Sequence, residues 1–441
     1  MTEKLLQYIW QHQYFNKNDL VTDGFVTEPL QIISPGIYNT DQGPDFSEAR
    51  IKIGEHSWAG NVELHVRASD WQKHKHQEDR NYLSVVLHVV WENDLPAGTY
   101  EPAIISLAPR VSKFLLQQYE EWMMSPSFIP CSSQLVSVPD LIWMKWKERL
   151  LIERLEKKTM EIQDYLQSSK NHWEEVFWWL LARNFGITVN REAFESVARS
   201  LPLNIIGKHK NQVHQLESLL FGQAGLLNGR FTEAYPMMLK KEFQFLKKKY
   251  QLTPVFAPIH FLRMRPVNFP SIRLAQLAML LFQSEHLFSK ILSVDHLSDL
   301  RKMFDITAND YWHYHYRFEE SSAYQPKKLG SQMIDNIIVN TIIPIVFAYG
   351  HYHKEIATKD RVLHWLDMMN AEKNRITMRF YSLGIRCENA FDSQALYELK
   401  TKYCDEKRCL ECAVGNSILK RPEPWPLGES TRHSGNRRHS G

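Results

Sequence analysis

The spacing of apolar residues changes near residue 111, and this change limits what the chain can fold into more than any other feature. Before it, short stretches such as 62–66 alternate apolar and polar residues, as half-buried strands do. After it, long segments such as 141–167 repeat apolar residues at helical spacing. The sequence therefore predicts an α/β core at residues 1–110 and a mainly α-helical region at 111–385.

The N-terminal core is expected to be a mixed sheet with flanking helices. Residues 2–15 have the amphipathic pattern of a helix, and the polar segment 70–81 is expected to form a second helix. The almost continuous apolar run at 85–91 is typical of a central strand that is buried on both faces. The predicted strands are 30–34, 49–53, 62–66, 85–91 and 103–107.

Two further segments follow the helical region. Residues 386–421 hold four of the five cysteines and are expected to form a small Cys-bearing module. Residues 422–441 are rich in Pro, Ser, Gly, Arg and His, a composition typical of a disordered tail.

The overall charge and hydropathy exclude few classes of protein. Lys and Arg number 53 against 50 Asp and Glu, a net charge of +3 that permits a nucleic-acid partner without indicating one. No uninterrupted apolar run approaches the roughly 18 residues that a membrane span requires, and the first residues lack a signal-peptide core. We therefore expect a cytoplasmic protein with no membrane partner.

Two acids and a histidine stand out in the predicted core. Asp45 lies in the turn before the strand 49–53, and Glu63 and His65 lie on the strand 62–66. Because side chains alternate along a strand, Glu63 and His65 share one face. Carboxylates suit hard divalent ions, so these residues predict a Mg²⁺ or Mn²⁺ site that could activate water.

The segment Pro44-Asp45, followed by Glu63-x-His65, resembles the motif of the PD-(D/E)XK nucleases. The predicted order of elements over about residues 2–108 is also similar to the nuclease core. The resemblance implies a restriction-endonuclease-like fold, a metal-dependent nuclease activity and a nucleic-acid partner. It implies that Asp45 and Glu63 are metal ligands, and that Glu3 matches an extra acid found on the first helix of some members.

One departure concerns the lysine of this motif, which is His65 here. Histidine titrates near neutrality, so His65 either assists the attacking water or marks a loss of catalysis. In the first case Asp45, Glu63 and His65 are the catalytic residues. In the second case the chain is an inactive nucleic-acid-binding protein on a nuclease-like fold. Lys52 or Arg67 is a candidate for the missing positive charge, and Arg67 is expected to contact substrate.

The whole chain also resembles DUF2851, a bacterial family with no assigned activity. This resemblance rests on segments near the acids, in the predicted central strand and close to the C-terminus. They are Gly43-Pro44-Asp45-Phe46, Asn61-Val62-Glu63-Leu64-His65-Val66, Ser69-Asp70-Trp71, Leu87-His88-Val89-Val90 and Asp392-Ser393-Gln394-Ala395-Leu396.

A run of potential ligands lies just after the acidic strand. His74, His76 and Asp79, together with His65, have donor types that bind Zn²⁺ or Mn²⁺. They support another hypothesis, a zinc or manganese hydrolase that acts on a small molecule. His74 is also a candidate contact for a substrate phosphate. The structural alternative is a solvated polar helix or loop.

The cysteines predict a second metal site. In a reducing cytosol, thiols clustered as in Cys409-x-x-Cys412 favour metal binding over disulfides. With Cys387 and Cys404 they could hold a structural zinc ion or a [4Fe–4S] cluster. Some nuclease relatives carry such a cluster on cysteines split along the chain, and by that analogy Cys131 replaces Cys387. Free buried thiols are the alternative.

The helical region holds a segment in which arginines alternate with aromatic residues. Arg263 and Arg265 lie close to Phe261 and Phe269, a mixture that suits phosphate and base contacts. We therefore predict that both arginines bind nucleic acid, and the alternative is a solvated surface.

Overall fold

The change of pattern near residue 111 is confirmed by the computed structural model, which has a sheet before it and mainly helices after it. The structure describes residues 1–24, 26–96, 102–253, 255, 257–262 and 264–420. The chain forms two compact units. Unit 1 comprises residues 1–146 and 399–441, and unit 2 comprises residues 147–398.

The predicted boundaries at residues 110 and 385 differ from this division. The first helical segment and the last three cysteines belong to unit 1 together with the sheet. Unit 1 therefore combines residues from both ends of the chain. The tail predicted at 422–441 lies outside the described residues.

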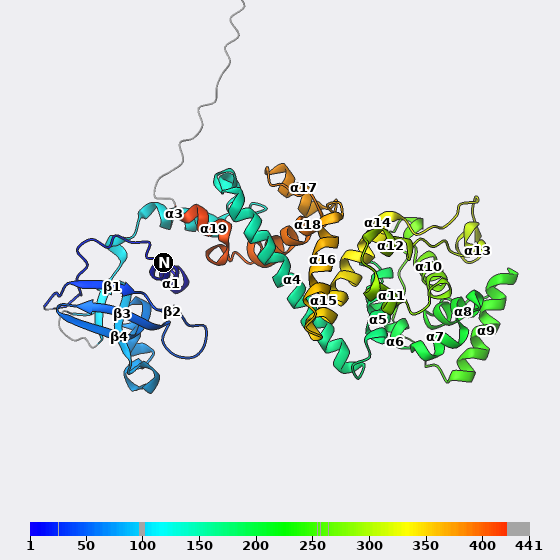
Figure 1. Cartoon of the computed structure of the whole chain (residues 1–441), viewed down its shortest axis with the longest axis horizontal. Coiled ribbons are helices and arrows are strands. Elements are labelled where there is room, and N and C mark those ends of the chain that lie inside the picture. Colours follow the sequence, from blue (N-terminus) through cyan, green and yellow to red (C-terminus); the bar gives the residue numbers. More distant parts are fainter. Residues whose placement is uncertain (25, 97–101, 254, 256, 263, 421–441) are drawn as a thin grey trace, which may run out of the picture. The chain divides into compact units, whose positions relative to one another are not determined.

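Unit 1 is built on one mixed sheet (Figure 1). The strand order is β1-β3-β4-β5-β6, and β2 pairs with β3. Pairing is antiparallel from β1 to β4 and parallel from β4 to β6. All five predicted strands are confirmed. The strands are β1 (Leu30–Ser34), β2 (Ile37–Tyr38), β3 (Phe46–Ile53), β4 (His56–Arg67), β5 (Val85–Glu92) and β6 (Ala103–Ser106).

Helix α1 (Glu3–His12) confirms the predicted N-terminal helix and packs against β4. The Thr2 hydroxyl accepts a hydrogen bond from the Leu5 N–H, which satisfies one of the free donors at the helix start. The apolar face of α1 is fully buried at Leu6, Ile9 and Trp10. This burial fixes the polar face of the helix relative to the sheet.

The segment 70–81 folds into short turns where one helix was predicted. These turns are α2 (Asp70–Lys73), η1 (His76–Glu78) and η2 (Arg80–Tyr82). Helix α2 ends because Lys75 adopts a left-handed conformation with φ of 58°. The Asp79 side chain then caps η2 by accepting the Asn81 N–H. The break at Lys75 changes the direction of the chain between His74 and His76.

The rest of unit 1 is helical. It includes the first residues of α4 (Asp140–Ser168), which continues into unit 2. The other elements are η3 (Ala108–Arg110), α3 (Lys113–Met124), η4 (Ser132–Ser137), η7 (Leu399–Cys404), η8 (Cys409–Glu411) and α19 (Ala413–Leu419).

Unit 2 is mainly helical, as predicted. Its helices are α5 (Trp173–Phe185), α6 (Arg191–Arg199), α7 (Leu203–His209), α8 (Val213–Gln223), α9 (Ala234–Tyr250), η5 (Pro266–Asn268), α10 (Pro270–Gln283), α11 (Leu287–Ser293), α12 (Leu297–Lys302), α13 (Asp310–His313), α14 (Ser331–Ile337), η6 (Ile338–Ile342), α15 (Ile343–Tyr352), α16 (Ile356–Met368), α17 (Arg375–Ser382) and α18 (Ala390–Glu398). A two-stranded sheet of β7 (His315–Arg317) and β8 (Glu320–Ser321) completes it.

One helical stretch of unit 2 bears on the expectation that the chain has no membrane span. The continuous helical stretch Ser331–Tyr352 is long and apolar enough to cross a membrane by length and composition alone. Polar residues such as Asp335 and Asn340 interrupt its apolar residues, so the sequence shows no continuous apolar run of this length. Its most apolar window is 78% buried within the protein, the environment of a core helix.

Candidate metal site

The two predicted acids lie side by side at one end of the β3–β4 pair. The register sets Phe46 opposite Val62, so Asp45 lies next to Glu63. The Asp45 N–H donates to Glu63 Oε2 over 3.0 Å, and the Leu64 N–H donates to Asp45 Oδ2 over 3.0 Å. Glu63 is 6% exposed, which is rare for a glutamate without a cationic partner.

Helix α1 adds two polar residues to this end of the sheet. Gln7 Nε2 donates to Asp45 Oδ1 over 2.8 Å. Glu3, one turn earlier on α1, is exposed, and its charge raises the pKa of both Asp45 and Glu63. The sequence analysis identified Glu3 but not Gln7. Gln7 could have been identified because it lies four residues after Glu3 and therefore on the same helix face.

His65 lies at the centre of a chain of imidazoles. Its Nε2 is 3.6 Å from Glu63 Oε1 and 3.1 Å from His74 Nδ1. Its Nδ1 is 2.9 Å from Nε2 of His88, which lies on β5. Each of these imidazole contacts joins one ring that donates a proton to another that accepts it.

His76 completes the cluster from the opposite side of the break at Lys75. Its Nε2 lies 3.5 Å from Glu63 Oε1 and is buried, and within the described part of the chain it has no hydrogen-bond partner. The ring of Tyr82 stacks on His76 with centroids 3.8 Å apart. Sequence reasoning missed Tyr82, because its stacking depends on the turns that replace the predicted helix.

Three imidazoles of this cluster are spaced like metal ligands. One ring nitrogen from each of His65, His74 and His76 lies within 4.8 Å of the other two. Asp79, the fourth residue in the sequence hypothesis, instead caps η2 through its carboxylate. The structure therefore groups three of the four proposed ligands, with Glu63 beside them.

Burial controls the protonation of the site. Burial raises the pKa of Asp45 to about 6, with a smaller contribution from the charge of Glu3. Burial and the neighbouring Asp45 raise the pKa of Glu63 to about 8. Burial and the adjacent imidazoles lower the pKa of His65 to about 3 and that of His88 to about 4. These shifts keep the imidazoles neutral, the form that binds metal.

Neither cation considered as a substitute for the missing lysine contacts the acids in the described structure. The Lys52 ammonium lies 3.5 Å from Glu55, at the opposite end of the β3–β4 pair. Arg67 is exposed near the end of β4, opposite Glu92 on β5. No lysine or arginine among the described residues forms an ion pair with Asp45 or Glu63, which agrees with the raised pKa of both carboxyl groups.

The two arginines predicted to bind nucleic acid lie in the part of the sequence that forms unit 2. Arg263 lies outside the described residues, and Arg265 is exposed at the start of η5 in unit 2. Arg273 of the same sequence segment is 7% exposed, and its guanidinium donates to the side-chain oxygens of Gln276 and Asn268. Its burial, at the start of α10, was not predicted.

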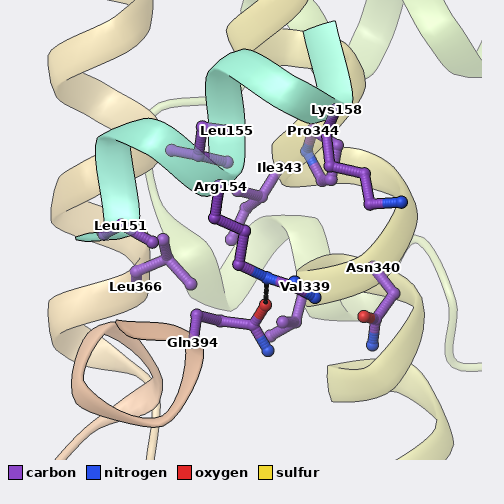
Figure 2. A pocket seen from close by; sticks show the side chains of 10 residues that line it. All are labelled: Leu151, Arg154, Leu155, Lys158, Val339, Asn340, Ile343, Pro344, Leu366 and Gln394. Carbon is purple, nitrogen blue, oxygen red and sulfur yellow. Dashed lines mark hydrogen bonds between the residues drawn. The ribbon is translucent and has the colours of Figure 1, made fainter. Parts of the chain in front are cut away.

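Unit 2 has concave surfaces of its own. Arg273 lines a polar cavity of about 660 Å³ that also includes Arg183, Arg191 and Asn336. A small apolar pocket lies alongside, between α4 and η6, where Arg154 Nε donates to Gln394 Oε1 over 2.6 Å (Figure 2). The sequence gave no signal for either, because their walls come from helices distant in the chain.

Unit 1 is thus a mixed α/β unit that brings together Asp45, Glu63, His65, His74 and His76 in one carboxylate–imidazole cluster, whose donors are of the kinds that bind a metal ion. The chain belongs to DUF2851, a family of proteins of unknown function, whose model matches residues 3–375. The match includes the whole carboxylate–imidazole cluster and ends before Cys387. No curated protein and no solved structure matches the chain.

Proposed function

We propose that unit 1 is a divalent-metal-dependent phosphodiesterase that acts on nucleic acid. The observation that carries this proposal is the position of Glu63 Oε1, 3.6 Å from His65 Nε2 and 3.5 Å from His76 Nε2. A carboxylate oxygen and two ring nitrogens with no cation between them are the donors that a divalent ion binds. Asp45 lies beside this group and has no cationic partner among the described side chains.

The mixture of donors favours Mn²⁺ or Zn²⁺ over Mg²⁺. Mg²⁺ takes oxygen ligands almost exclusively, whereas Mn²⁺ accepts both carboxylate and imidazole, and Zn²⁺ is commonly bound by histidine. Glu63 would contribute Oε1, and Asp45 would bind directly or orient a metal-bound water. Glu3 is then a charge at the margin of the site.

A bound ion would polarise a substrate phosphate and lower the pKa of a bound water. The protein would supply the proton acceptor. Asp45 is suited to this role, because it lies beside the metal donors and burial raises the pKa of its carboxyl group to about 6. His74, the exposed member of the trio, would contact a substrate phosphate. His65 would then be a metal ligand at the position where the PD-(D/E)XK motif has its lysine.

A second candidate function is a zinc or manganese hydrolase of a small molecule. The observation that favours it is the His65, His74 and His76 trio, since three histidines with an open fourth position are a common catalytic zinc site. Both proposals place the protein in the cytoplasm and use the same cluster, but they differ in substrate.

A cleavage assay tests the proposal. The full chain is incubated with single- and double-stranded DNA and RNA in the presence of Mg²⁺, Mn²⁺ or Zn²⁺. We expect cleavage by the wild type, and a loss of about 100-fold in Glu63→Gln. Glu55→Gln is the matched control, because Glu55 is an exposed glutamate just before the same strand.

Three outcomes would contradict the proposal. Cleavage that survives Glu63→Gln would show that the activity resides elsewhere. Binding of nucleic acid without cleavage by any metal-loaded form would support the inactive nucleic-acid-binding protein. Hydrolysis of small phosphoesters or amides but not of nucleic acid would favour the second candidate.

A further inference from the structure

Four of the five cysteines gather in unit 1. Helix α19 packs against η4 and η8, and η7 packs against η8. Each of these elements has a cysteine at or beside its end: Cys131 before η4, Cys404 at the end of η7, Cys409 at the start of η8 and Cys412 before α19. The packing of these elements therefore brings the four cysteines into one part of unit 1.

The three C-terminal cysteines lie on one tightly folded segment. A Cβ atom at Gly415 would lie 2.3 Å from the carbonyl oxygen of Cys409. Glycine is therefore needed for the first turn of α19 to rest on the backbone of Cys409. The Cys412 N–H also donates to the Cys409 carbonyl oxygen over 3.4 Å. This packing holds Cys409 and Cys412 close together.

Cys387, the fourth ligand favoured by the sequence, belongs to unit 2, where its sulfur lies 3.4 Å from Ser393 Oγ. Cys131, the alternative ligand, belongs to unit 1 together with Cys404, Cys409 and Cys412. Because α19 packs against η4, which begins after Cys131, we infer that Cys131 is the fourth ligand.

Among the described residues, the cysteine sulfurs do not form a group as compact as His65, His74 and His76, so they do not make a preformed site for a single ion. A tetrahedral zinc ion with Zn–S bonds near 2.3 Å would need sulfurs about 3.8 Å apart. In a [4Fe–4S] cluster each thiolate binds a different iron, so the sulfurs lie farther apart.

The surroundings of the sulfurs suit thiolates bound to iron. Cys131, Cys409 and Cys412 are at most 8% exposed, so solvent is largely excluded. Low solvent exposure is one of the features that tune iron–sulfur clusters.

We propose that Cys131, Cys404, Cys409 and Cys412 bind a [4Fe–4S] cluster that links the segment before η4 to the C-terminal segment of unit 1. The proposal is independent of the carboxylate–imidazole site and of its function. It identifies the cluster as a structural element, because it joins segments distant in the sequence.

The test uses the full chain purified without oxygen. Iron and acid-labile sulfide are measured for each chain, and electron paramagnetic resonance is recorded before and after dithionite reduction. We expect about four irons and four sulfides per chain, and the signal of a reduced [4Fe–4S] cluster. The variants Cys131→Ser and Cys387→Ser are compared, the second being the matched control.

Cys131→Ser should lose most of the iron and sulfide, whereas Cys387→Ser should retain both. Because Cys131→Ser could also unfold, the Cys387→Ser result and the wild-type spectrum each test the proposal separately. Stoichiometric zinc without sulfide in the wild type would overturn the cluster. Equal loss of iron in Cys387→Ser would overturn the ligand set, and a chain with neither metal would overturn the site.

Discussion

Each unit of this protein buries at least one glutamate, and Glu63 of unit 1 and Glu217 of unit 2 have different surroundings. Glu217 on α8 is fully buried, and its carboxylate accepts hydrogen bonds from Tyr235 Oη, Asn309 Nδ2 and Trp312 Nε1. Glu63 on β4 faces Asp45 and the ring nitrogens of histidines. Burial raises the pKa of both, to about 7 for Glu217 and about 8 for Glu63.

The comparison shows that a raised pKa does not by itself identify a functional site. Three neutral donors surround the Glu217 carboxylate, which is the pattern of a structural hydrogen-bond network. Beside Glu63 are atoms that can bind a cation, including a buried His76 nitrogen with no hydrogen-bond partner in the described structure. The surroundings of Glu217 indicate a structural role, and those of Glu63 agree with the metal-binding role proposed for it.

The largest expected effect is on the stability of unit 2. Glu217→Ala leaves three buried donors without an acceptor and opens a cavity, so we expect a loss of about 4 kcal/mol. Hydrogen exchange measured by mass spectrometry on α8 and α13 peptides reports this loss separately from unit 1. Glu285→Ala, which removes an exposed glutamate of the same unit, should change protection little. Equal losses of protection in Glu217→Ala and Glu285→Ala would contradict the structural role of Glu217.

The stability of unit 2 should depend on pH because Glu217 titrates at different pH values in the folded and unfolded states. The pKa of Glu217 is about 7 in the folded state and near 4.5 when exposed, so the folded state binds more protons between these values. Stability is then fully present below pH 4.5 and falls as pH rises through 7, by about 3 kcal/mol. Denaturant titrations at pH 5 and 8 should show this fall in the wild type and a smaller one in Glu217→Gln. If the stability of Glu217→Gln fell as much between pH 5 and 8 as that of the wild type, Glu217 would not be the group responsible.

Metal should stabilise unit 1 and leave unit 2 unchanged. With Mn²⁺ at about 100 times its dissociation constant, we expect a gain of about 2.7 kcal/mol. Hydrogen exchange in β4 and β5 peptides measures it. His76→Gln should lose the gain, whereas His56→Gln should keep it, because His56 is exposed at the opposite end of β4. Equal protection of unit 2 peptides would indicate nonspecific binding.

The smallest effect is expected for Glu63→Gln without metal. At pH 7 the raised pKa keeps Glu63 largely protonated, so the neutral amide replaces a group that is already mostly neutral. We expect the stability of unit 1 to change by no more than about 1 kcal/mol. A loss as large as that of Glu217→Ala would show that Glu63 has a structural role.

Much of unit 1 could be predicted because its signals are local. Alternation along a strand predicted that Glu63 and His65 share a face, and the turn at Asp45 preceded a recognisable strand. The approach of His74 and His76 to His65 could not be predicted, because it depends on the left-handed Lys75. A helix through 70–81 would have separated the two rings.

Other parts depend on contacts between segments distant in the sequence. The cysteines were recognised as a group, but composition could not show that Cys131 belongs with the C-terminal segment while Cys387 does not. The hydrogen-bond network of Glu217 could not be predicted either, because the side chains that donate to its carboxylate come from α9 and the α13 region. The spacing of residues in the sequence indicates local secondary structure. Which distant residues come into contact is decided by tertiary packing.

The most direct test of the metal site is a Mn²⁺ titration followed by electron paramagnetic resonance, because Mn²⁺ prefers oxygen and imidazole ligands to the cysteine thiolates. We predict one tightly bound Mn²⁺ in the wild type and in Glu55→Gln, and none in Glu63→Gln. Tight binding that persists in Glu63→Gln, or no tight binding in the wild type, would contradict the assignment of the carboxylate–imidazole cluster as a metal site.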